Sequence, residues 1–442
     1  MRVDVVVIGA GLGGLACARD LVRAGTDVLL LEARDRPGGR VEGEVLADGR
    51  LVQVGGEVVG TVHRAYRGLA DELGLALVPS YTDVPGETYY DLTDGLHRGE
   101  GWLTDDDLAS LGSLTSALIA AGRGIDPSAP LRESDAGRLD RLSVHDLARD
   151  VGATSTALRR LDLGLRYTGI GDSRTLSVLA AARTCAAVGG HSPEDYSVWE
   201  NLKVDGGSSR MVDALVASIG DRIRYAAPVV AIHVGTPCRV VVDDGEVIEA
   251  DAVVCGVPLM PLRAVEISGL SEERLRGLRA QRSTPVSKAV VALDSAVWET
   301  VGGNGQILSE RESGGFWVQG GTVLSSLNGP EVIARISRQP EQQATRDLLT
   351  GLERVVGPVG TPTVLWRHWG GDPWTLGYAP DWAPGAMVDV GPLHGRHEPP
   401  FYVAGSDHWA SGYMEGAVAT GRNAAAAVLG DASAHPLYPA AR

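Results

Sequence analysis

The first forty residues combine short apolar runs with a glycine-rich turn. Residues 3–8 form a continuous run rich in β-branched side chains, which predicts a strand buried on both faces of a parallel sheet. The run continues into glycines at positions 9–14, and apolar residues then recur at helical spacing as far as Gly25. A second apolar run, residues 27–31, ends at Glu32. This order predicts a βαβ unit of about thirty residues with an acid at the end of its second strand.

The glycines of the turn have the GxGxxG spacing of dinucleotide-binding proteins. In this motif Gly9 permits a tight turn, Gly11 lets the backbone approach a pyrophosphate, and Gly14 allows the helix to pack closely on the strand. Gly13 lies in the same turn, and Glu32 is placed to accept hydrogen bonds from ribose hydroxyls. We therefore predict a dinucleotide site, with a glycine-rich turn that binds no ligand as the alternative.

The segment after the acid favours one dinucleotide over another. Residues 32–40 read EARDRPGGR. They resemble the second fingerprint of the glutathione-reductase-like FAD proteins, in which an arginine and paired glycines continue the diphosphate site. The resemblance implies FAD rather than NAD, and it assigns to the cofactor site Glu32, Ala33, Arg34, Gly39 and Arg40.

Further apolar runs show how the rest of the chain is organised. Short strands are expected at 223–225, 229–234, 239–242 and 247–254, with a hairpin turn at 243–246, which together predict an inserted β-meander. Another strand is expected at 401–404, followed by an alanine-rich helix over 414–429. Residues 105–183 have a mostly helical pattern, with a break at 122–130.

These elements predict two domains, each built from separated segments. The expected FAD-binding domain comprises residues 1–75, 205–285 and 390–430, and the expected substrate-binding domain comprises residues 76–204 and 286–389. Residues 431–442 are expected to form a frayed tail. The predicted fold class is α/β: a glutathione-reductase-like FAD-binding Rossmann domain with the inserted meander, plus an α+β substrate domain.

Composition excludes several classes of protein. The 442 residues carry 40 basic and 56 acidic side chains, a net charge of −16, which argues against nucleic-acid binding. No run of 18 apolar residues is present, so we expect a cytoplasmic protein without a membrane partner. The four cysteines form no CxxC pair, and we expect them to be reduced and buried, with no metal site. The oligomeric state is left open, with a homodimer as one alternative.

Three segments together identify a family. They are residues 9–40, the VDGG sequence at 204–207, and residues 401–422, which read FYVAGSDHWASGYMEGAVATGR. All three resemble the flavin-containing amine oxidases, the monoamine oxidase family, and SGYMEGA at 411–417 is the most specific match. The resemblance implies oxidation of an amine to an imine and then an aldehyde, with reduction of O2 to H2O2.

The resemblance also implies roles for individual residues. Tyr413 and Tyr378 correspond to the two walls of an aromatic sandwich that holds the substrate amine before the flavin. Lys288 corresponds to a lysine that reaches flavin N5 through a water, and it is one of only two lysines in the chain. Trp369 corresponds to a tryptophan that flanks the ring, and Val229 to a backbone contact with the adenine portion. The remaining expected cofactor contacts are Gly55, Gly56, Gly405, Ser406, Gly412, Met414 and Ala417.

One departure from the family concerns how the cofactor is attached. Animal monoamine oxidases bind FAD covalently through a cysteine immediately before the tyrosine that corresponds to Tyr378. That position is Gly377 here, so we expect FAD to be held non-covalently. The membrane-anchoring helix of those enzymes also has no counterpart in this sequence.

The loop after Val54 bears on the substrate. L-amino-acid oxidases carry an arginine for the substrate carboxylate where this chain has Val58 and Val59, although Arg64 and Arg67 lie close in the sequence. Several polyamine oxidases supply an acid at the position of Gly60; Glu57 is near that position, so the polyamine alternative stays open.

Aromatic residues of the second domain point to a hydrophobic primary amine. Phe316, Trp317, Tyr89 and Tyr90 are each expected to pack in a core, but together they are numerous enough to line an apolar cavity. We therefore predict a small-molecule amine and O2 as substrates. The alternatives are an L-amino-acid oxidase of secondary metabolism, an FAD amine dehydrogenase with a protein acceptor, a flavin-dependent isomerase or mutase, and a flavin scaffold without catalysis.

Overall fold

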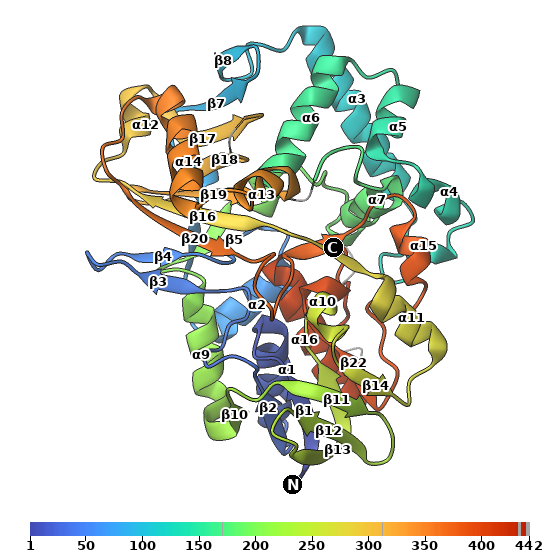
Figure 1. Ribbon diagram of the computed structural model, residues 1–442. Coiled ribbons are helices and arrows are strands. Elements are labelled where there is room, and N and C mark those ends of the chain that lie inside the picture. The colour runs from blue at the N-terminus through green and yellow to red at the C-terminus, as the bar shows by residue number, and fades with distance from the viewer. Residues whose placement is uncertain (170, 312, 432–434, 439–442) are drawn as a thin grey trace.

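The computed structural model describes residues 1–169, 171–311, 313–431 and 435–438. Two large sheets lie at opposite ends of the molecule (Figure 1), with the N-terminal sheet at the bottom and the second sheet at the upper left. A group of helices stands beside the second sheet at the upper right. Segments from the start, the middle and the end of the chain meet in the lower sheet, as its mixed colours show.

The lower sheet contains the predicted βαβ unit. Its order is β10-β2-β1-β13-β12-β11-β14, and β22 pairs with β13. The pairs β10·β2, β2·β1, β1·β13 and β13·β22 are parallel, whereas β11, β12 and β13 form the antiparallel meander. The strands are β1 Arg2–Ile8, β2 Val28–Leu31, β10 Ile223–Arg224, β11 Val229–His233, β12 Cys238–Val242, β13 Val247–Cys255, β14 Glu266–Ser268 and β22 Phe401–Val403.

The first strand is buried on both faces, as its unbroken apolar run predicts. Val5 and Val7 face one apolar cluster, and Val6 and Ile8 face another. The first cluster lies under α1 Leu12–Arg23, α2 Arg64–Glu72, α9 Ser209–Ile219 and α16 Tyr413–Val428. The second lies under α10 Leu259–Leu262 and α11 Glu272–Ala280.

Two details of the lower sheet differ from the sequence prediction. The strand expected at 223–225 does not join the meander; as β10 it pairs in parallel with β2, because it emerges from α9 at the opposite edge of the sheet. The meander also gains β14, which pairs in parallel with β11. The remaining predicted strands and the last helix are confirmed to within two residues.

The second sheet has the order β20-β16-β19-β18-β17-β7-β8. Strand β16, which lies between β20 and β19, is buried along its whole length. Ala289 and Val291 pack in a cluster that includes residues of α14 (Glu341–Val356), whereas Val290 and Ala292 pack against the hairpin of β3 (Gly43–Val45) and β4 (Leu51–Gln53). The strands are β7 Glu87–Leu92, β8 Gly95–Arg98, β16 Ser287–Ala292, β17 Gly303–Ser309, β18 Gly315–Gly320, β19 Val323–Asn328 and β20 Thr363–His368.

Helices cover this sheet and its flank. The break predicted at 122–130 is confirmed, because α3 ends at Gly122 and the next helical turn begins at Pro130. Helix α3 begins with a capping box between Thr104 and Asp107. The helices are α3 Asp105–Gly122, α4 Ala136–Arg141, α5 Val144–Asp150, α6 Ser155–Tyr167, α7 Val178–Ala187, α8 Tyr196–Trp199, α12 Val297–Thr300, α13 Pro330–Ile336, α14 Glu341–Val356 and α15 Ala386–Val390.

Three small sheets join the two halves. The three-stranded sheet β5-β9-β6 connects segments that are more than 100 residues apart in the sequence, and β15 pairs with β21 beside the last helix. The strands are β3 Gly43–Val45, β4 Leu51–Gln53, β5 Val58–Val59, β6 Leu77–Pro79, β9 Leu202–Val204, β15 Arg282–Thr284 and β21 Ala379–Asp381.

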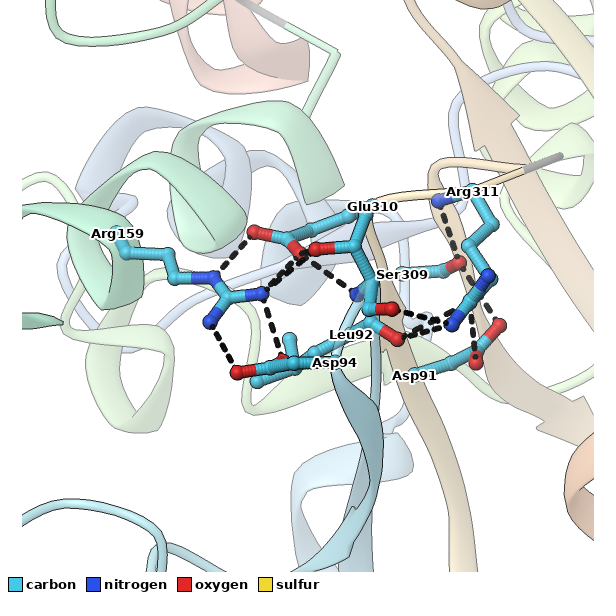
Figure 2. A network of polar contacts seen from close by, with 8 residues as sticks. Asp91, Leu92, Asp94, Arg159, Ser309, Glu310 and Arg311 are labelled. Atoms are coloured by element: carbon cyan, nitrogen blue, oxygen red, sulfur yellow. Dashed lines mark hydrogen bonds and ion pairs between the residues drawn. The ribbon is translucent and has the colours of Figure 1, made fainter.

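A polar network fixes the far edge of the second sheet. Figure 2 shows Arg159 between Glu310 and Asp94, and Arg311 between Asp91 and the carbonyl of Leu92. Asp91 is 1% exposed and also forms an ion pair with Arg354 at 2.6 Å, so its buried charge has two cationic partners.

Several simpler expectations can now be compared with the structure. The four cysteines are buried and unpaired, as predicted. Tyr438 is not frayed as expected of the tail: its ring stacks on Trp409 and its hydroxyl accepts a hydrogen bond from Arg183. Residues 432–434 and 439–442 of the expected tail lie outside the described residues. Within the part of the chain that the structure describes, no helix is long and apolar enough to cross a membrane.

Candidate functional site

A large cavity runs from the carboxyl ends of the lower sheet's parallel strands to the second sheet. Every predicted site residue except Gly412, the residue that precedes α16, contributes to its wall. These lining residues are Gly9, Gly11, Gly13, Gly14, Glu32, Ala33, Arg34, Gly39, Arg40, Gly55, Gly56, Val229, Lys288, Trp369, Tyr378, Gly405, Ser406, Tyr413, Met414 and Ala417. The structure thus brings together residues that are 400 positions apart, while their individual roles stay predictions.

The glycine-rich turn is tightly packed except where it faces the cavity. A Cβ on Gly14 would lie 1.9 Å from the carbonyl oxygen of Gly9, and a Cβ on Gly13 would lie 2.7 Å from the nitrogen of Gly405. A Cβ on Gly11 would meet nothing within 4 Å, although Gly11 lines the cavity. Gly13 and Gly14 are therefore required for packing, whereas the open space at Gly11 suits the close approach of a ligand.

Glu32 is held rigidly at the end of β2. Its Oε2 accepts a hydrogen bond from the backbone nitrogen of Ala10 at 2.7 Å, and its Oε1 accepts one from that of Arg34 at 2.9 Å. The Arg34 side chain is itself fixed by Asp372 at 2.7 Å. The carboxylate lines the cavity with lone pairs that remain available to a hydroxyl-bearing ligand.

The wall at the start of the last helix also fits a polar ligand. Ser411 Oγ is buried, has no hydrogen-bond partner among the described residues and belongs to the cavity lining. Helix α16 begins beside it, and its first turns contribute Met414 and Ala417 to the wall. The positive end of a helix dipole stabilises negative charge, so this wall suits the anionic part of a reduced flavin. Together with the Gly11 opening, the residues present fit FAD.

Two tyrosines project into the cavity from different segments. Tyr413 starts α16 with a left-handed backbone, φ 57°, which is costly for a residue that is not glycine and marks a position imposed by its surroundings. Its hydroxyl donates to Glu200 Oε1 at 2.9 Å. Tyr378 is fixed through its backbone, which donates to Thr284 at 2.9 Å and accepts from Arg40 at 2.5 Å. Burial, reinforced by the carboxyl group of Glu200, raises the pKa of both phenols, so both are neutral at physiological pH.

Lys288 approaches the same space from the second sheet. Its side chain is 3% exposed, and Nζ donates to the carbonyl oxygen of Gly55 at 2.8 Å and to Glu57 Oε2 at 2.7 Å. Its ammonium also lies 5.7 Å from the centre of the Trp317 ring. The lysine is therefore a buried charged group at the cavity wall, with one N–H left over from these two hydrogen bonds.

Two acidic residues of the site were not identified from the sequence. Glu57 was noted only as a neighbour of Gly60, yet it lines the cavity and forms an ion pair with Lys288. Glu200 was not noted at all; it is 8% exposed and accepts hydrogen bonds from Tyr81 and Tyr413. Burial raises the pKa of Glu200, and the two phenol donors oppose that shift. The VDGG segment that follows was the nearest sequence signal, but nothing in it marks the acid.

The predicted aromatic lining is only partly correct. Trp317 lines the cavity, whereas Phe316 and Tyr90 are buried in the core of the second sheet, and the hydroxyl of Tyr89 donates to the carbonyl oxygen of Val301. The reason is strand alternation, which points neighbouring residues to opposite faces. Other aromatic residues line the cavity instead, and these are Tyr167, Trp199, Trp374 and Trp382.

Comparisons with known proteins agree with this geometry. The pattern of the family described as flavin containing amine oxidoreductase matches residues 12–429. AofH of Mycobacterium tuberculosis, a protein assigned to the flavin-containing monoamine oxidases, is 31% identical over 96% of both chains. Putrescine oxidase of Kocuria rosea is 30% identical over 97% of this chain and 96% of its own.

Solved structures show the same fold. A structure of putrescine oxidase bound to putrescine has a TM-score of 0.89 at 24% identity and covers 97% of this chain and 99% of its own. Cyclohexylamine oxidase of Brevibacterium oxydans has a TM-score of 0.85 at 24% identity and covers 98% and 99%. The predicted fold class, a Rossmann-like parallel sheet combined with a second mixed sheet, is confirmed.

Proposed function

Since the chain belongs to the family of flavin-containing amine oxidoreductases, we propose that it is an oxidase of a hydrophobic primary amine with non-covalently bound FAD. The overall reaction is RCH2NH2 + O2 + H2O → RCHO + NH3 + H2O2. When bound, FAD would supply the two-electron redox chemistry between the amine and O2. The observation that carries the proposal is that Tyr378, Tyr413 and Lys288 share one cavity with the glycine-rich turn.

The two tyrosines account for the binding of an amine. Loss of two electrons from the α-carbon requires the neutral amine, because a protonated nitrogen has no lone pair to assist the departure of hydride. Neutral phenol rings supply an apolar, water-poor surface without a fixed counter-charge, so they favour the uncharged nitrogen. The proposed role of Tyr378 and Tyr413 is therefore to select and orient the deprotonated amine beside the cofactor.

Non-covalent binding is supported by the packing around Gly377. A Cβ at this position would lie 2.1 Å from Ser283 Oγ, so a cysteine does not fit there without a shift of the chain. Acid precipitation of the holoprotein is therefore expected to release all the yellow colour into the supernatant. Colour that stays in the pellet would contradict non-covalent binding.

The polar groups of the cavity argue against the L-amino-acid oxidase alternative. Among the described lining residues the only arginines are Arg34 and Arg40, which are engaged by Asp372 and Asp407. Glu200, which accepts a hydrogen bond from Tyr413, would repel a substrate carboxylate when it is ionised, and both lining arginines already have carboxylate partners.

A diamine is a second candidate, because an acidic residue faces the substrate end of the cavity. Glu200 contacts Tyr413 and lines the wall, which places a carboxyl group where a second ammonium would be stabilised. If the substrate is a diamine, Glu200→Gln should raise the KM for the diamine at least tenfold. The KM for a monoamine of similar length should stay within about threefold of the parent value. Equal effects on both substrates would favour the hydrophobic monoamine.

The decisive experiment is anaerobic mixing of the holoprotein with a panel of amines and amino acids, including benzylamine, cyclohexylamine and putrescine. Bleaching of the oxidised flavin band, followed by peroxide formation on re-aeration, is the expected result. A flavin that stays oxidised with every compound would refute the proposal. Bleaching without rapid reoxidation by O2 would instead indicate a dehydrogenase with a protein acceptor.

A further inference from the structure

We infer that Glu57 is a positioning residue for Lys288: its carboxylate holds the ammonium at the cavity wall and balances its charge. The inference rests on the proposed function, because it concerns the lysine expected to act beside the flavin. The sequence pattern alone does not show that Glu57 takes part in the reaction.

The carboxylate of Glu57 is held by more than the lysine. Oε2 accepts hydrogen bonds from Ser325 Oγ at 2.7 Å and Gln319 Nε2 at 3.1 Å, and Oε1 accepts one from Trp317 Nε1 at 3.0 Å. All three donors come from β18 and β19, and β19 is the strand that pairs with β16. With Lys288 the group has four donors, so both oxygens are fixed and the negative charge is well stabilised in a buried place.

The environment of Lys288 shows why such a partner is needed. The side chain leaves a strand buried along its whole length, and an unpaired ammonium there would lose most of its hydration without compensation. The flexible four-carbon stem also gives Nζ several reachable positions. Glu57 at 2.7 Å and the carbonyl oxygen of Gly55 at 2.8 Å together define one of them.

The third N–H of the Lys288 ammonium is not used by Gly55 or Glu57 and is the donor that can act in the cavity. Lys288 lines the cavity, and two of its three donors are used by Gly55 and Glu57 within the described residues. Gly55 itself lines the cavity and is an expected cofactor contact, so the hydrogen bond ties the ammonium to the segment expected to hold the flavin. A lysine fixed in this way presents its remaining N–H to the cavity at a constant place.

The other acid of the site does not perform this task. Glu200 is engaged by the phenols of Tyr81 and Tyr413, and no hydrogen bond links it to Lys288 in the part of the chain that the structure describes. Removing the charge of Glu57 should therefore affect the flavin through Lys288.

The test is a double-mutant cycle on the holoprotein, with Glu57→Gln, Lys288→Met and the double variant. The flavin is reduced chemically with dithionite and its reoxidation by O2 is followed at the oxidised flavin band. This measurement needs bound FAD but no amine, so its outcome is independent of whether the proposed amine oxidation is correct. The flavin absorption spectrum is the second readout, because it responds to charge near the ring.

We expect Lys288→Met to slow reoxidation, and Glu57→Gln to slow it about tenfold, because a misplaced ammonium loses most of its effect. In the Lys288→Met background, Glu57→Gln should change neither the rate nor the spectrum further. Ser325→Ala is the graded comparison: it removes a neutral donor from the same Oε2 without removing the charge, and it should slow reoxidation less than Glu57→Gln does.

Three results would overturn the inference: an unchanged rate and spectrum in Glu57→Gln, an equal effect of Glu57→Gln with and without the lysine, or a Lys288→Met variant that reoxidises normally. If Lys288→Met fails to retain FAD, Glu57→Asp replaces it in the comparison. It keeps the charge but withdraws it by one methylene, so it should be faster than Glu57→Gln; a rate equal to that of Glu57→Gln would count against the charge-balancing role.

Discussion

A substitution at Gly377 tests how tightly the backbone before Tyr378 packs against Ser283. A Cβ at Gly377 would lie 2.1 Å from the Oγ and 2.5 Å from the Cβ of Ser283, well inside contact distance. Gly377→Ala therefore forces either the backbone before Tyr378 or strand β15 to move. Overpacking of this kind costs about 1–3 kcal/mol, and the severity of the overlap places the variant at the upper end.

The strain should reach function through Tyr378. This residue is tied to Thr284 of β15 through its backbone nitrogen at 2.9 Å, so a displaced β15 carries the tyrosine with it. We expect Gly377→Ala to lower both the unfolding temperature and kcat/KM for the best amine, with about a tenfold loss in kcat/KM if the ring moves by an ångström.

Ser283→Gly supplies the matched control. It removes both atoms that clash, at the cost of the hydrogen bond from Ser283 Oγ to the carbonyl oxygen of Ala379 at 3.0 Å, worth about 1 kcal/mol. In the double variant Gly377→Ala/Ser283→Gly we expect most of the lost stability and activity to return. Thermal unfolding of apoprotein and holoprotein, followed by circular dichroism, measures the first, and peroxide formation measures the second. The reasoning is refuted if Gly377→Ala alone unfolds at the parent temperature, or if Ser283→Gly brings no recovery.

Three further changes test the surrounding framework. Burial raises the pKa of Glu415 from 4.5 to about 7, so its ionisation should destabilise the folded state by about 3 kcal/mol as pH rises from 4.5 through 7. The unfolding temperature should therefore fall less between pH 5 and pH 8 in Glu415→Gln than in the parent. An equal fall in both proteins would contradict this pKa argument. Asp91→Ala removes the carboxylate that Arg311 and Arg354 share. Because both arginine side chains are 31% exposed, the free energy of unfolding should fall by about 1–3 kcal/mol in denaturant unfolding, and the flavin spectrum should not change. Tyr438→Phe removes the hydroxyl that accepts from buried Arg183 at 3.0 Å and should lower stability by about 1 kcal/mol in the same assay; no loss would show that the tail contact is dispensable.

The cofactor end of the molecule was predictable because its signals are local. The strand, glycines, helix and acid of residues 2–32 follow one another without interruption, and each constrains its neighbours in the sequence. The meander was likewise predictable from two adjacent hairpins. The misplaced strand β10 shows the limit of such reasoning: its apolar pattern predicts a strand but does not tell which edge of the sheet it joins.

The second sheet and the acidic groups of the site were much harder to predict from the sequence. Strand β7 pairs in parallel with β17, more than 200 positions later in the sequence, and no local pattern predicts that pairing. Glu57 becomes part of a site only when β18 and β19 bring their donors to it, and Glu200 only when Tyr413 arrives from the last helix. The aromatic prediction was only partly correct for the same reason, since only the register of β18 decides that Trp317 and not Phe316 faces the cavity.

The charges around the cavity are consistent with a site that binds an uncharged amine. Lys288 and Glu57 form a pair whose net charge is zero, so neither adds a long-range field where the substrate binds. Burial raises the pKa of Glu200, the acid beside Tyr413, and its two hydrogen-bond partners are neutral phenols rather than cations. Protonated, it leaves the wall neutral and suits a hydrophobic monoamine; ionised, it supplies the counter-charge that a second ammonium requires. The same carboxyl group thus separates the two candidate substrate classes, which is why the Glu200→Gln comparison decides between them.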